Sequence, residues 1–356
     1  MANINDYLRW RGDVIIDKRY PFNELDSLIL ARFSYMLFHK IKMEEKETIR
    51  SISKKMEKFN NKEFLFNGDK ELISNLGTSD RFKDMIVTDF VRHNNKEVEK
   101  QFSAITIHIS NKEMYISYMG TDDNLYGWKE DFNMAFMDKV PSQLDGTKYL
   151  REMAKKYPKK KIRVGGHSKG GNIAVYASIS VNKMIKNRIE KVYSYDGPGQ
   201  SKKTIDKKCK DDFILKVKSY IPQDSIIGRV LEHKEECVIV KSNEKGIMQH
   251  DIYSWEVKKD DFETLDKLTK SSENINKTIK KWLENTTPEQ REVFIDIMFE
   301  LFNGILSGRI DNFFSGWTQN IPKISKKYKE LSEENKKAVT SMIKEFLKAY
   351  FNVIKS

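Results

Sequence analysis

The chain has 356 residues, of which 39% are hydrophobic and 33% are charged. This balance is typical of a folded globular protein and excludes a largely disordered chain. No apolar run is long enough to cross a bilayer, and the first twenty residues lack the apolar core of a signal peptide. The two cysteines, Cys209 and Cys237, show no disulfide or metal-ligand spacing, so we expect a cytoplasmic protein.

The formal net charge is +12, and lysine supplies most of the positive side chains. These lysines are spread along the chain and do not form one patch interleaved with aromatic residues. We therefore interpret them as a solvated surface and do not expect nucleic-acid binding. The basic run from Pro158 to Val164 has the same interpretation, because its lysines end a helical pattern and Ile162 begins a strand.

Residues 1–100 are predicted to be mainly helical. Asn23 precedes Glu24 and Asp26 and is a plausible N-cap of a helix whose apolar residues recur at helical spacing. A second helix is expected over residues 46–59.

Residues 101–259 alternate between strand and helix patterns, which is typical of a mostly parallel sheet covered by helices. We assign residues 1–259 to one α/β domain, made of a helical N-terminal segment over residues 1–100 and a core over 101–259. Strands are expected at residues 102–109, 114–119, 162–165, 191–195, 213–220 and 236–241, and helices at 143–157 and 172–181.

Residues 260–356 are predicted to form a helical C-terminal region that serves as a cap or a partner surface. Thr287 is a good helix cap because Pro288 follows at the first helical position, and another helix is expected after Ser332. Aromatic residues of this region are candidates for a peripheral membrane contact, with packing onto the core as the alternative. They are Phe299, Phe302, Phe313, Phe314 and Trp317.

The segment from Gly166 to Gly170 has the pattern Gly-x-Ser-x-Gly, with Ser168 at its centre. A strand pattern precedes it and a helix rich in small residues follows, which is the context of a nucleophile elbow. The alternative is a glycine turn that only permits close packing. A Walker A phosphate loop does not fit, because Lys169 follows the serine.

A serine nucleophile needs a base and an acid, which this architecture presents in the chain order serine, acid, histidine. His250, in a loop after a late strand, is favoured over His233, which resembles a surface histidine. Asp224 is the favoured acid because it follows the strand before the histidine, and Asp196 is the alternative. His167, beside the nucleophile, is given no catalytic role.

The oxyanion of the tetrahedral intermediate needs two hydrogen-bond donors. One is expected to be the backbone N–H of Lys169, which follows the nucleophile. The other is expected from Thr121, in the loop that follows an earlier strand, although this stretch also fits a plain turn rich in aspartate.

Several of these segments together resemble the class-three lipases, and more closely a bacterial branch of that α/β-hydrolase superfamily classed as a domain of unknown function. The resemblance covers about Asn5 to Val257. It rests on Met119–Asp122 with Trp128 and Asp131, Gly166–Asn172, Pro222–Gly228, and Gln249–Asp251 with Trp255. It implies an α/β-hydrolase fold with Ser168, Asp224 and His250 as the catalytic triad and Thr121 in the oxyanion hole.

The function expected from the sequence is a serine hydrolase that cleaves carboxylic or lipid esters without a metal or other cofactor. The alternative is a catalytically weak α/β-hydrolase scaffold that acts as a binding protein. The sequence does not identify a protein partner.

Overall fold

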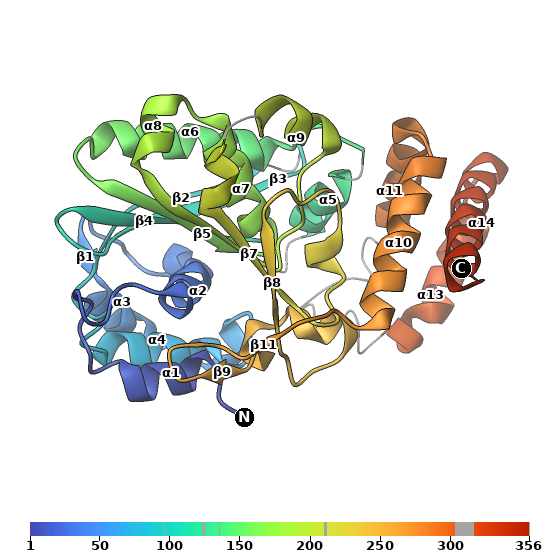
Figure 1. Cartoon of the computed structure of the whole chain (residues 1–356). Helices are drawn as coiled ribbons and strands as arrows, with labels where there is room; N and C mark the ends of the chain where they lie inside the picture. Colours follow the sequence, from blue (N-terminus) through green and yellow to red (C-terminus); the bar gives the residue numbers. More distant parts are fainter. Residues whose placement is uncertain (96, 123–124, 135, 210–211, 303–316, 356) are drawn as a thin grey trace.

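The computed structural model describes residues 1–95, 97–122, 125–134, 136–209, 212–302 and 317–355. A central sheet has helices on both faces, and a further group of helices stands to one side of this unit (Figure 1). Phe313 and Phe314, two of the aromatic residues considered for membrane contact, lie outside the described residues.

Nine strands form the central sheet within the described residues, in the order β1-β2-β3-β4-β5-β6-β7-β8-β11. Strands β4 to β8 run parallel, whereas β1 to β3 and β11 add antiparallel edges. This is an α/β-hydrolase-like fold, as predicted. The strands are β1 Glu47–Thr48, β2 Ile86–Asn95, β3 Lys100–His108, β4 Glu113–Tyr118, β5 Lys161–His167, β6 Ile189–Tyr195, β7 Val217–Pro222, β8 Glu236–Val240 and β11 Thr264–Leu265. A separate hairpin pairs β9 Val257–Lys258 with β10 Asp261–Phe262.

Each face of the sheet carries its own apolar core. The N-terminal helices pack on one face, where α2 contacts β4, β5 and β6, and α6 and α7 pack on the other (Figure 1). Because successive side chains along a strand point to opposite faces of the sheet, each strand contributes apolar residues to both cores. The helices around the sheet are α1 Ile4–Arg11, α2 Glu24–Phe33, α3 Ile49–Met56, α4 Asp69–Thr78, α5 Leu125–Asn133, α6 Pro141–Lys156, α7 Lys169–Ser180, α8 Lys183–Arg188 and α9 Lys202–Lys208.

Three sequence predictions about this region need correction. The sheet begins before residue 101, because β2 lies within the segment predicted to be mainly helical and pairs with β3. The predicted strand over 213–220 begins as a 3-10 helix, Asp212–Lys216, before β7 starts. The sheet also continues past residue 259, because Thr264 and Leu265 pair with β8. The Asn23 cap and the helix after it are confirmed, since the Asn23 side chain accepts a hydrogen bond from the backbone N–H of Asp26.

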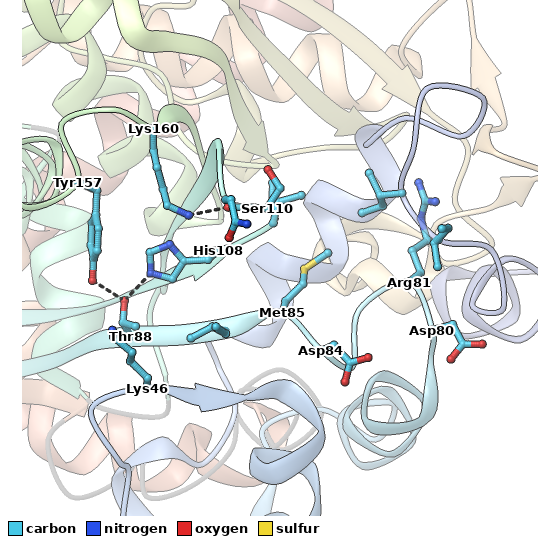
Figure 2. Close-up of a pocket in the computed structure, with 15 residues that line it drawn as sticks. Lys46, Asp80, Arg81, Asp84, Met85, Thr88, His108, Ser110, Tyr157 and Lys160 are labelled. Carbon is cyan, nitrogen blue, oxygen red and sulfur yellow. Dashed lines mark hydrogen bonds between the residues drawn. The ribbon is translucent and has the colours of Figure 1, made fainter.

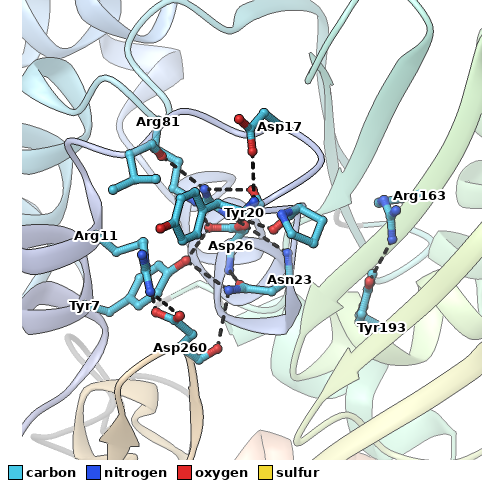
Figure 3. Close-up of polar contacts among 12 residues, drawn as sticks. Tyr7, Arg11, Asp17, Tyr20, Asn23, Asp26, Arg81, Arg163, Tyr193 and Asp260 are labelled. Atoms are coloured by element: carbon cyan, nitrogen blue, oxygen red, sulfur yellow. Dashed lines mark hydrogen bonds and ion pairs between the residues drawn. The ribbon is translucent and has the colours of Figure 1, made fainter.

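The N-terminal segment is joined to the segment after β8 by a polar network, which Figure 3 shows. The guanidinium of Arg81 pairs with the fully buried Asp26, with 2.6 Å between Nη2 and Oδ2, and Tyr7 donates a hydrogen bond to the same carboxylate. Arg11 pairs with Asp260, and Asn23 donates to the Asp260 carbonyl. Residues more than two hundred positions apart are therefore held together around α1 and α2.

The C-terminal helices are α10 Lys270–Asn285, α11 Pro288–Phe302, α13 Trp317–Glu330 and α14 Glu333–Lys355. The predicted helix starts after Thr287 and Ser332 are confirmed. Helices α10 and α11 both contact α14, and α11 also contacts α5, where the Phe299 ring lies 5.7 Å from that of Phe132. No helix among the described residues combines the length and apolarity needed to cross a membrane.

Candidate active site

Ser168 lies in the tight turn between β5 and α7, with φ 57° and ψ −132°. This backbone conformation is strained for a residue with a side chain and is typical of a nucleophile elbow. The glycines on either side are required by close approach. A Cβ on Gly166 would lie 2.4 Å from the Gly170 carbonyl carbon, and one on Gly170 would lie 2.1 Å from the Tyr118 oxygen. The local geometry is therefore that of the predicted elbow.

His250 lies at the end of a short 3-10 helix, Gly246–His250, and its ring is placed by a carboxylate. Nδ1 of His250 donates a hydrogen bond to Oδ2 of Asp196 over 2.6 Å. Asp196 follows β6 directly, and only 2% of its side chain is exposed. Its other oxygen accepts hydrogen bonds from the Ser225 hydroxyl at 2.5 Å and from the Gly228 N–H at 3.1 Å. The carboxylate is thus fixed on both sides, which orients the imidazole.

Asp224, the favoured acid of the sequence analysis, is wrong as the partner of His250. Its Oδ1 accepts a hydrogen bond from the Thr269 hydroxyl at 2.5 Å, and its Oδ2 accepts one from the Gly246 N–H at 2.8 Å. Asp224 therefore supports the loop that begins the 3-10 helix and the start of α10. The loop carries His250 back over the end of β6, so the aspartate after β6 meets the ring and the one after β7 does not.

His233, the less favoured base, is hydrogen-bonded to Glu235 and largely buried, so it is not the exposed histidine that was expected. Burial alone would lower its pKa, but hydrogen bonds with Cys237 and Glu235 raise the pKa of His233 to about 10. Ligand atoms of these three residues lie within 4.8 Å of one another, a set that is able to hold a metal ion. The Glu235 carboxylate also accepts hydrogen bonds from Ser219 and from the Lys234 N–H.

His167 has a role that the sequence analysis missed. Its Nε2 donates a hydrogen bond to the His250 carbonyl over 2.9 Å, and the two imidazole rings lie 4.5 Å apart. Burial, His250 and Arg32 hold the pKa of His167 well below its usual range, so the ring is neutral and retains one N–H to donate. The Tyr35 hydroxyl donates in turn to the His167 carbonyl at 3.0 Å. The residue before Ser168 therefore holds the loop of the candidate base.

The loop that carries Thr121 packs directly on the elbow. A Cβ on Gly120 would lie 3.2 Å from that of Ser168 and 2.6 Å from the His167 carbonyl oxygen, so only glycine fits there. Thr121 is 6% exposed, and its hydroxyl donates to Oδ2 of Asp131 over 2.5 Å. Because that hydroxyl is engaged with Asp131, the candidate oxyanion donor at this residue is its backbone N–H.

Lys169 lies at the amino end of α7, and its side chain is fully buried among carboxylates. Its ammonium lies 3.1 Å from Glu130 and 3.8 Å from Oδ1 of Asp131. Glu130 is also fully buried and accepts backbone hydrogen bonds from Gln101 and Ser142. Burial raises the pKa of Asp131 to about 6, against the opposing effects of Lys169 and Thr121. The sequence analysis considered only the backbone N–H of Lys169. In the structure its side chain also ties the elbow to the helix that follows the Thr121 loop.

A pocket of about 600 Å³ lies elsewhere, at the opposite end of the sheet from Ser168 (Figure 2). Figure 2 shows His108 beside Thr88, whose hydroxyl is also hydrogen-bonded to Tyr157. Burial and the neighbouring Lys160 lower the pKa of His108 to about 4, so this ring is neutral at physiological pH. The pocket does not include Ser168 or His250, so its size does not mark the candidate active site.

Comparison with known proteins yields a family match and distant similarities to lipases. The Mbeg1-like family model matches residues 76–300, which is more than half of the chain. No curated protein matches. Among solved structures, similarity extends to a fungal lipase in complex with an inhibitor, at 16% identity and a TM-score of 0.32 over 43% of this chain and 65% of that one. This chain therefore spans less than two thirds of the length of that lipase.

Two further solved structures are similar at the same low level. The Lip2 lipase from Yarrowia lipolytica is 13% identical, with a TM-score of 0.31 over 48% of this chain and 68% of that one. The M37 lipase is 14% identical, with a TM-score of 0.34 over 57% of this chain and 67% of that one.

Proposed function

The chain belongs to the Mbeg1-like family, a lipase-like branch of the α/β-hydrolase superfamily, and we propose that it is a serine hydrolase of carboxylic or lipid esters. One observation carries the proposal. His250 is hydrogen-bonded through Nδ1 to the buried Asp196 at 2.6 Å, and its ring centroid lies 4.5 Å from that of His167, the residue before Ser168 in the strained elbow. A nucleophile, a base and an orienting acid are the three groups that acyl transfer by serine requires.

In this proposal the Ser168 hydroxyl attacks the acyl carbonyl carbon while Nε2 of His250 takes its proton. Asp196 keeps Nδ1 protonated and stabilises the imidazolium that forms. The backbone N–H groups of Lys169 and Thr121 donate hydrogen bonds to the oxyanion. His250 then returns the proton to the leaving alcohol, and water attacks the acyl-enzyme by the same route. Membership of a lipase-like family supports esters, lipid esters included, as the substrate class.

The test is covalent labelling with a fluorophosphonate probe, which reacts only with an activated serine. We expect the wild-type protein to be labelled and the variants Ser168→Ala and His250→Ala to be unlabelled. Ser178→Ala is the matched control, because this second serine is fully buried in α7, the helix that follows the elbow. Its labelling should equal that of the wild type.

Labelling that survives Ser168→Ala would refute the assignment of the nucleophile. No labelling of folded wild-type protein, with or without mild detergent, would refute the hydrolase and favour the scaffold function. If labelling is lost in both variants, a panel of acyl esters of increasing chain length separates simple esters from lipid esters.

A further inference from the structure

Helix α14 has two apolar faces, and only one of them is covered. Val339, Met342 and Ala349 are buried, and the main chain of Met342 accepts a hydrogen bond from Trp282 of α10. The second face is turned about a quarter of the helix circumference away and is exposed to solvent. We call it the outer stripe, and its members are Ile343, Leu347, Tyr350, Phe351 and Ile354.

The outer stripe is regular and unusually exposed for its composition. Its residues follow one another at the i, i+4, i+7, i+8 and i+11 positions, which lie on one side of a helix. Phe351 is 55% exposed and Ile354 is 52% exposed. Figure 1 places α14 at the outer edge of the molecule, with α10 and α11 on its inner side. A continuous apolar stripe at such a position marks a binding surface.

A line of lysines runs along the edge of the outer stripe that faces away from the buried side. Lys337, Lys344, Lys348 and Lys355 are separated by seven, four and seven residues, so they share one line along the helix, and all four are exposed. Glu345 lies 3.7 Å from Lys348, and both groups remain partly accessible. Across α13 and α14 together there are nine lysines against four glutamates. Positive charge is therefore concentrated beside the exposed apolar residues.

We propose that α14 binds an anionic lipid surface, with the outer stripe inserted among the acyl chains and the lysine line at the level of the headgroups. Long lysine side chains can reach from the edge of an apolar stripe to the phosphate groups of lipids. Each lysine near an anionic surface adds to the binding free energy. A second copy of the chain would cover the stripe but would bring two strongly positive molecules together. A lipid surface accounts for both the stripe and the lysines.

The experiment is flotation of the full chain with two kinds of vesicle, pure phosphatidylcholine and phosphatidylcholine mixed with phosphatidylglycerol. We expect binding to the mixed vesicles that weakens as salt is added, because screening reduces the attraction of the lysines. The variant Lys344→Glu/Lys348→Glu should bind at least about tenfold more weakly. The variant Leu347→Ser/Phe351→Ser should lose binding at low salt as well.

Controls on the small helix α8 match each change. Met184→Ser removes an apolar side chain that is 76% exposed, and Lys183→Glu reverses an exposed charge, so neither should alter flotation. Ser168→Ala should float like the wild type, which separates this proposal from the proposed hydrolase. Absence of flotation with mixed vesicles, or flotation of both α14 variants to the same extent as the wild type, would overturn the proposal. A dimer seen by light scattering that Leu347→Ser/Phe351→Ser dissolves would also overturn it.

Discussion

Replacing Lys169 with methionine removes the only side-chain cation that the structure places within salt-bridge distance of Glu130 among the described residues. The carboxylate would remain fully buried without its partner, which typically lowers the free energy of unfolding by roughly 3–5 kcal/mol. Glu130 keeps backbone hydrogen bonds from Gln101 at 3.0 Å and Ser142 at 2.8 Å, which continue to stabilise its charge. We therefore expect the lower end of that range, about 3 kcal/mol, a large share of a typical stability of about 5–15 kcal/mol.

Guanidinium unfolding followed by circular dichroism measures this loss. Lys183→Met, at an exposed lysine of α8, is the matched control and should stay within about 0.5 kcal/mol of the wild type. Adding Glu130→Gln to Lys169→Met removes the unpaired charge and should recover part of the lost stability, because the amide oxygen can accept only one of the two backbone hydrogen bonds that the carboxylate accepts. If Lys169→Met unfolds at the same midpoint as the control, the buried ion pair does not stabilise this region and the reasoning fails.

Three further predictions test the site and the fold. Asp196→Asn should lower ester turnover by about 10⁴-fold because the ring loses its orienting acceptor, whereas Asp224→Asn should lower it far less; equal losses would contradict the pairing. Because burial raises the pKa of Asp131 to about 6, its carboxyl favours the folded state below about pH 4, and that contribution is lost as the pH rises through 6. Asp131→Asn should therefore lose less stability than the wild type between pH 4 and 7. If the unfolding midpoints of the two proteins change with pH in parallel, Asp131 does not contribute to the pH dependence. Arg32→Met leaves Asp69, which is 1% exposed, without its cation and should cost roughly 3–5 kcal/mol in unfolding experiments; an unchanged midpoint would speak against it.

The parallel centre of the sheet was predictable because its strands are short apolar runs between helical patterns. Strand β2 was not, since its alternation of apolar and polar residues is interrupted. The pairing of β2 with β3 shifts register between Thr88 and Val91, and Asp89 within this irregularity has φ 57°. An extra residue at such a bulge moves the following side chains to the other face, so the period of two that marks a strand is lost.

The elbow, the candidate nucleophile and the candidate base followed from local pattern, whereas the partner of the base did not. Asp196 and Asp224 both lie between Ser168 and His250 in the sequence and both follow a parallel strand, so chain order allows either. The choice depends on the path of the loop that carries His250, and that path is set by tertiary contacts such as the hydrogen bond from His167. The buried ion pair of Lys169 could not be predicted either. A lysine in a basic chain suggests a solvated surface, and only the structure shows its buried carboxylate partners.

The first residues of the chain are anchored to the segment that follows the candidate base. Val257 donates a backbone hydrogen bond to the Ala2 carbonyl, and Asn3 donates to the carbonyl of Tyr253, three residues after the candidate base. The family model matches residues 76–300, a range that does not include these first residues. A fragment cut at that boundary would keep every residue of the proposed triad and would lose the docking site of the segment that follows His250. The range that the family model matches is thus smaller than the structural unit that supports the candidate site.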